Sequence, residues 1–113
     1  MSERQRHPAV ELDEVVHQRV RLGILAVVRA TDAAEFGYLK EILELTDGNL
    51  HRHLEVLREA GYVTATRSTA RAADAADRRP RTVVAITDAG RRAFDAELAQ
   101  LNRLAELEAD PRF

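Results

Sequence analysis

The chain has 113 residues, of which 45 % are hydrophobic and 32 % are charged, values typical of one globular domain rather than a disordered chain. It contains no cysteine, which excludes disulfide bonds, thiolate metal sites and cysteine nucleophiles. No stretch approaches the roughly 18 consecutive apolar residues of a membrane span, and we expect a cytoplasmic protein.

The formal net charge of -2 argues against a protein held on nucleic acid by a general basic excess. The distribution of charge along the chain, by contrast, favours contact with nucleic acid. Between residues 62 and 87, five arginines stand against two aspartates, which leaves a local net charge of +3. A domain this short also buries only part of the surface of its unfolded chain, so a second subunit would add useful burial.

The N-terminal part predicts a polar arm followed by a long helix. Residues 1–10 are polar and contain Pro8, and we expect them to form a mobile arm ahead of a single domain at residues 11–113. From residue 11 to about residue 29, apolar side chains recur at helical spacing. Gly23 costs about 1 kcal/mol relative to alanine inside a helix, so we expect another element to approach closely there.

A pair of helices joined by a tight turn is predicted next. Residues 31–32 interrupt the apolar pattern, residues 35–37 predict a short strand, and residues 38–45 predict a second helix. Thr46 is a good N-cap for a third helix, and Asp47 suits the positive end of its dipole. Gly61 fits the left-handed conformation that ends such a helix. The inward face of the third helix consists of leucines at helical spacing: Leu50, Leu54 and Leu57.

The C-terminal part predicts a two-stranded ribbon and a last helix. Residues 62–66 and 82–87 are rich in valine, threonine and isoleucine, and both predict strands. The segment between them is polar and forms the long tip of a hairpin spanning about residues 62–87. Thr87 caps a helix at about residues 88–108, whose apolar face exceeds what one small domain needs.

This order of elements predicts a mainly α fold with a small β-hairpin, a winged helix-turn-helix. In such folds the second helix of the pair enters the major groove of double-stranded DNA with its N-terminal residues leading. Arginine can pair with guanine and asparagine with adenine, whereas Thr46 and the first-turn N–H groups can hold a phosphate. On the third helix the candidate DNA contacts are Thr46, Gly48, Asn49, His51, Arg52 and His53, and in the hairpin they are Arg67, Arg78, Arg79 and Arg81.

Three blocks of sequence carry a family resemblance: LDEVVHQRVRLGILAVV, YLKEILELTDGNLHRHLEVLREAGYV and RPRTVVAITDAGRRAF. Together they resemble small winged-helix transcriptional regulators related to the MarR and ArsR families, over roughly residues 12–101. The resemblance implies transcriptional regulation, most simply repression, by a homodimer joined through the N- and C-terminal helices. The residues expected at that interface are Leu12, Val16, Phe94, Leu98, Leu101 and Leu104.

Other functions remain open at this point. A winged helix that binds protein instead of DNA is the main alternative, because the fold alone does not set the function. A small-molecule effector between the first and last helices is a further possibility. We expect no enzyme activity, cofactor or metal site, because Ser68 and the four histidines assemble no catalytic or metal motif.

Overall fold

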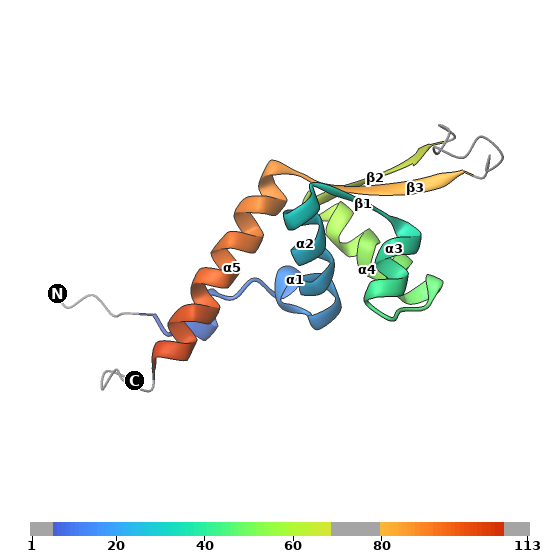
Figure 1. Ribbon diagram of the computed structural model, residues 1–113. Helices are drawn as coiled ribbons and strands as arrows, with labels where there is room; N and C mark the ends of the chain where they lie inside the picture. Colours follow the sequence, from blue (N-terminus) through green and yellow to red (C-terminus); the bar gives the residue numbers. More distant parts are fainter. Residues whose placement is uncertain (1–5, 69–79, 108–113) are drawn as a thin grey trace.

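The computed structural model describes residues 6–68 and 80–107, and its element order confirms the winged helix (Figure 1). The elements in chain order are a 3-10 helix η1 (Pro8–Glu11), α1 (Glu14–His17), α2 (Arg19–Thr31), β1 (Ala33–Glu35), α3 (Phe36–Ile42), α4 (Asp47–Glu59), β2 (Val63–Ser68), β3 (Arg81–Ile86) and α5 (Asp88–Glu106). The expected hairpin tip at residues 69–79 lies outside the part of the chain that the structure describes.

The three strands form one antiparallel sheet in the order β1-β3-β2. Strands β2 and β3 pair from Val63 opposite Ile86 to Ser68 opposite Arg81. The short strand β1 pairs with the base of β3, with Ala33 opposite Ala85. The β2–β3 ribbon therefore extends beyond the helices as a wing, whereas its base is held in the body of the domain (Figure 1).

The prediction of one continuous helix from residue 11 to residue 29 is wrong, because two polar side chains interrupt it. Asp13 Oδ1 accepts a hydrogen bond from the Val15 N–H at 2.9 Å and caps α1. Gln18 is extended, and its Oε1 accepts from the N–H groups of Val20 and Arg21 at 2.7 and 3.0 Å. Such local bonds offer the backbone an alternative to the helical ladder. The apolar periodicity continues across the break because both helices face the same core.

The core lies where α2 meets α3, α4 and the sheet. Leu50, Leu54 and Leu57 of α4 are buried, which confirms the prediction that they face inward. The core also contains buried apolar side chains of α2, α3 and β3: Ile24, Leu25, Val28, Leu39 and Val84. The close approach expected at Gly23 is also present, because a Cβ there would lie 3.1 Å from Leu43 Cδ2. The buried leucines fix which face of α4 remains exposed.

Helix α5 leaves the base of the sheet and runs along the N-terminal segment (Figure 1). Element η1 packs against α5, and Pro8 is buried. The second half of the expected N-terminal arm is thus packed on the domain. Residues 1–5 lie outside the described chain, and their mobility stays a prediction. Glu97 of α5, only 1 % exposed, accepts from the Asp13 N–H at 2.9 Å.

The start of α5 has no room for a side chain at Gly90. A Cβ there would collide with the Tyr62 carbonyl oxygen and lie 3.0 Å from Ile86 Cγ1. The Thr87 side chain holds this corner, because its Oγ1 accepts from the Gly90 N–H at 3.0 Å and donates to the Gly61 carbonyl at 2.6 Å. The contact made by Gly90 is with backbone, which cannot move aside without disturbing the wing base.

We therefore predict that Gly90→Ala lowers the free energy of unfolding by about 1–3 kcal/mol, the usual cost of overpacking. The matched control is Gly37→Ala in α3, where a Cβ would meet nothing within 4 Å. That control should gain up to about 1 kcal/mol from helix propensity. Urea unfolding followed by circular dichroism measures both. Equal stability of the two variants would contradict the packing described for Gly90.

Candidate nucleic-acid interface

The turn between α3 and α4 holds the start of α4 in place. Thr46 is the N-cap of α4, as predicted, and its Oγ1 accepts from the Asn49 N–H at 3.2 Å. Lys40 Nζ lies 2.8 Å from Asp47 Oδ1, and this ion pair joins the end of α3 to the first turn of α4. The hydrogen bond and charge of Lys40 lower the pKa of Asp47. The α4 N-terminus therefore has an ion pair beside it rather than an unbalanced charge, and the phosphate alternative stays a prediction.

The exposed face of α4 carries five of the six residues predicted there: Thr46, Gly48, Asn49, His51 and Arg52. Arg52 Nη2 donates to Asn49 Oδ1 at 3.2 Å. The His51 ring lies over the Phe36 ring, with centroids 4.5 Å apart. A Cβ on Gly48 would meet nothing within 4 Å, so no other element among residues 6–68 and 80–107 covers the helix at that point.

The prediction that His53 lies on this exposed face is wrong. His53 is 9 % exposed, and its Nδ1 lies 3.2 Å from Arg21 Nη1. Arg21 also donates from Nε to the Val15 carbonyl at 2.6 Å, so it joins α1, α2 and α4. The sequence contained a signal for this burial, because residue 53 falls three positions after Leu50 and four before Leu57, within the apolar stripe.

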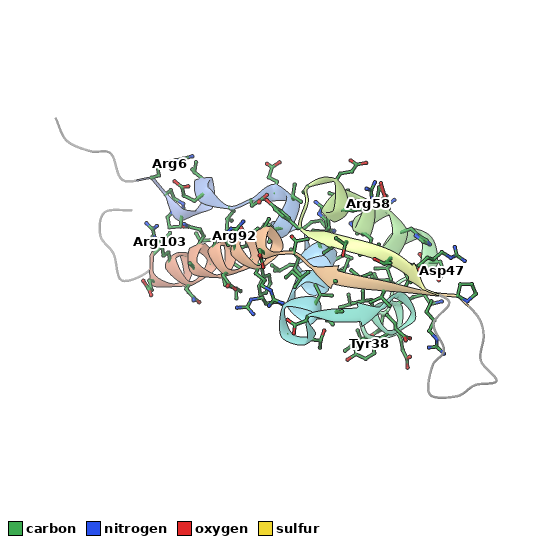
Figure 2. All side chains as sticks on the ribbon, turned by 90° about the horizontal axis from the view of Figure 1, so that it is seen from above. Arg6, Tyr38, Asp47, Arg58, Arg92 and Arg103 are labelled. Atoms are coloured by element: carbon green, nitrogen blue, oxygen red, sulfur yellow. The ribbon has the colours of Figure 1, made fainter. Side chains whose placement is uncertain are left out.

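The arginines predicted for the wing have different surroundings. Arg67 on β2 is exposed. Arg81 Nη1 lies 3.0 Å from Glu35 Oε2, which ties the first residue of β3, at the end near the hairpin tip, to the end of β1. Arg78 and Arg79 belong to the range that the structure leaves undescribed, and their role stays a prediction. The wing and the start of α4 lie on the same side of the molecule, away from α5, as both views show (Figures 1 and 2).

Two of the residues expected at a dimer interface belong instead to the core of a single chain. Val16 is 0 % exposed and Phe94 is 7 % exposed, so neither offers surface to a second copy. Leu98 is 42 % exposed, and three others are half-buried: Leu12, Leu101 and Leu104. Of these four, Leu98, Leu101 and Leu104 lie on the C-terminal half of α5.

Among residues 6–68 and 80–107, no group of three or more histidine, aspartate or glutamate side chains could hold a metal ion. No helix among them is long and apolar enough to cross a membrane.

Comparison with known proteins identifies the family. A family model described as a winged helix DNA-binding domain matches residues 20–105, and the chain belongs to this family. It is 37 % identical over 93 residues to the protein MJ0432 of Methanocaldococcus jannaschii, a match that covers 82 % of this chain and 95 % of the other.

Two solved structures extend the comparison. A transcriptional regulator homologue from Pyrococcus horikoshii superposes with a TM-score of 0.76 and 32 % identity, over 87 % of this chain and 91 % of that one. A MarR-family transcriptional regulator from Silicibacter pomeroyi superposes with a TM-score of 0.62 and 20 % identity, over 93 % and 66 % of the two chains. The chain therefore shares its winged-helix fold with both regulators.

The buried His53 predicts a specific pH dependence of stability. Burial, followed by the charges of Arg21 and Arg52, lowers the pKa of His53 below its usual value near 6.5. The unfolded chain thus binds a proton more readily, and the free energy of unfolding should fall as the pH drops below about 7. His53→Gln keeps an acceptor for Arg21 without titrating, so it should lose less stability between pH 7.5 and pH 5.5.

The control is His51→Gln, which changes an exposed histidine on the same helix. This variant should keep the wild-type pH dependence. Urea unfolding at the two pH values measures all three proteins. If His53→Gln lost as much stability as the wild type, the lowered pKa of His53 would be contradicted.

Proposed function

We propose that this protein binds specific sequences of double-stranded DNA as a homodimer and represses transcription at those sites. One observation supports it above the rest: Asn49 and Arg52 stand exposed on α4, opposite the buried leucines, in a chain of the winged helix DNA-binding family. An α-helix of about 10 Å diameter fits a major groove about 12 Å wide. The uncovered Gly48 allows the first turn of α4 to come close to the base edges.

The wing supplies contacts to the DNA backbone, which do not depend on the base sequence of the DNA. Arg67 is exposed on β2, and Arg78 and Arg79 follow it in the sequence, ahead of β3. Arginines in this position can meet phosphates beside the groove that α4 occupies. Arg81 contributes less directly, because its ion pair with Glu35 ties the first residue of β3 to β1. The positive charge at residues 62–87 thus favours contact with phosphates, although the whole chain has a net charge of -2.

The homodimer is supported by the exposed leucine on α5. Leu98 and the half-buried Leu101 and Leu104 lie on one helix, at the end of the molecule away from the wing (Figure 1). Pairing two such helices would bury apolar surface and present two copies of α4 to half-sites one helical turn of DNA apart, about 34–36 Å. A dimer on a promoter would exclude polymerase, which is why we favour repression over activation.

The DNA contact is tested by Arg52→Ala, with Arg58→Ala as its matched control. Arg58 is also an exposed arginine of α4, but it pairs with Glu55 and lies further along the helix from Asp47 (Figure 2). Fluorescence anisotropy on a duplex selected from a random library, and on single-base variants of it, measures discrimination. We expect Arg52→Ala to lose about 1–3 kcal/mol of discrimination at one base pair. Arg58→Ala should keep it.

Two results would contradict the proposal. If the wild-type protein bound all duplexes equally, sequence-specific recognition would fail and the protein-binding alternative would gain support from the acidic net charge. If both variants lost discrimination to the same extent, α4 would not be reading bases through Arg52.

The dimer is tested separately by Leu98→Asp. A carboxylate in the proposed interface should produce monomers in analytical ultracentrifugation, because an unpaired charge is costly to bury. Ile42→Asp is the control, since Ile42 is an apolar residue on α3 that is even more exposed than Leu98, at 49 % against 42 %. It should leave the sedimentation coefficient unchanged. A Leu98→Asp protein that still sedimented as a dimer would place the interface elsewhere.

A further inference from the structure

Asn49 holds the side chain of Arg52 on the exposed face of α4. Arg52 Nη2 donates to Asn49 Oδ1 at 3.2 Å, and both residues are exposed. In the part of the chain that the structure describes, residues 6–68 and 80–107, neither side chain has a second hydrogen bond or an ion pair. The cap of α4 uses the Asn49 N–H, not its amide side chain. The contact therefore restricts Arg52 without contributing to the packing of the domain.

The acceptor that holds Arg52 is uncharged, although carboxylates lie on the same helix. Glu55 is three residues after Arg52, a spacing at which helical side chains meet. Arg58, however, contacts Glu55 through both Nε and Nη2. Asp47, in the first turn of α4, is paired with Lys40. Because both carboxylates hold another cation, the positive charge of Arg52 is left for a ligand.

The bond to Asn49 leaves Arg52 able to read a guanine. A guanidinium has five N–H donors in a planar fork, and this bond uses one of the two on Nη2. If Asn49 takes the Nη2 hydrogen beside Nη1, the donor pair on Nε and Nη2 stays free. If it takes the hydrogen beside Nε, the pair on Nη1 and Nη2 stays free. In both cases one pair of adjacent donors remains for N7 and O6 on the major-groove edge of guanine.

We propose that Asn49 is a positioning residue, which holds the Arg52 guanidinium so that its free edge meets a guanine in the major groove. This inference rests on the proposed function, because it concerns how the exposed face of α4 selects a base. A free arginine side chain loses conformational entropy when a ligand orders it. Asn49 restricts Arg52 before DNA binds, so the loss on binding is smaller. Asn49 thus acts at the base pair that Arg52 reads.

The competing role for Asn49 is direct recognition of adenine. Oδ1 keeps a second lone pair and Nδ2 keeps both hydrogens, so the amide could accept from adenine N6 and donate to N7. A base pair that offers guanine to Arg52 contains no adenine. Direct recognition would therefore act at a different base pair from the one that Arg52 reads, and this difference separates the two roles.

The experiment is a double-mutant cycle with the full chain. Fluorescence anisotropy compares a duplex selected from a random library with duplexes in which each base pair is replaced in turn. The base pair at which Arg52→Ala loses about 5- to 150-fold of discrimination is the one that Arg52 reads. Asn49→Ala should lose about 2- to 10-fold at that same base pair, the usual effect of one hydrogen bond. In the Arg52→Ala background, Asn49→Ala should have no further effect there.

Asn49→Asp is the rescue variant. Its carboxylate still accepts from Arg52 but cannot donate to adenine N7, so it should retain discrimination at the base pair that Arg52 reads. Its charge repels phosphates and should weaken binding to every duplex alike. Because both side chains are exposed, all variants should keep the fold, which circular dichroism checks.

Three results would overturn the inference while leaving DNA binding intact. They are unchanged discrimination at the Arg52 base pair in Asn49→Ala, an equal loss there in Asn49→Asp and Asn49→Ala, and an Arg52→Ala protein that loses discrimination at no base pair. Failure of the wild type to discriminate between any duplexes would instead overturn the proposed function, and this inference with it.

Discussion

Burial of the leucine face of α4 is the constraint on which the rest of the molecule depends. Leu50, Leu54 and Leu57 pack with α2 and the sheet, and a buried leucine contributes about 1.5–3 kcal/mol relative to an exposed one. Rotating α4 to present another face would expose all three. The packing that stabilises the domain therefore also determines which side chains of α4 reach solvent.

Polar contacts connect α5 to α1 and to the residue that precedes β2. The Tyr62 hydroxyl donates to Asp13 Oδ2 at 2.8 Å, and the Asp13 N–H donates to the buried Glu97. His17 Nδ1 lies 2.8 Å from Glu97 Oε2, close enough for an ion pair when His17 is protonated. A buried carboxylate needs such partners, because desolvation of an unpaired charge is costly. Helix α5 is thereby fixed to α1 and to the base of the wing, so a dimer made through α5 would hold its two α4 helices at a set spacing.

Much of the fold could be predicted because its signals are local. The Thr46 cap, the leucine spacing of α4 and the turn at Gly61, which has a φ of 82°, each depend on residues a few positions apart. The break at Gln18 was missed because the apolar pattern continues across it. His53 was missed because a polar residue type concealed its position in the apolar stripe. Contacts between distant segments, such as Arg81 with Glu35, leave no local signal at all.

The residues expected at the dimer interface show a second reason why prediction from the sequence fails. Apolar periodicity shows that a helix face is buried, but it does not say whether the same chain or a second copy buries it. Val16 and Phe94 have the expected pattern, yet their own chain covers them. Among the candidate DNA contacts, Asn49 and Arg52 were correctly placed on the exposed face, whereas their mutual hydrogen bond depends on side-chain conformations and on where the neighbouring carboxylates are engaged.

In the function proposed for this protein, the exposed face of α4 meets DNA. Nuclear magnetic resonance can detect this contact, by following the backbone amide signals of the full chain as a duplex is added. We expect the largest shifts in the first two turns of α4, from Asp47 to Arg52, with smaller ones in the wing. Shifts confined to α3 or α5, with the α4 signals unchanged, would contradict it.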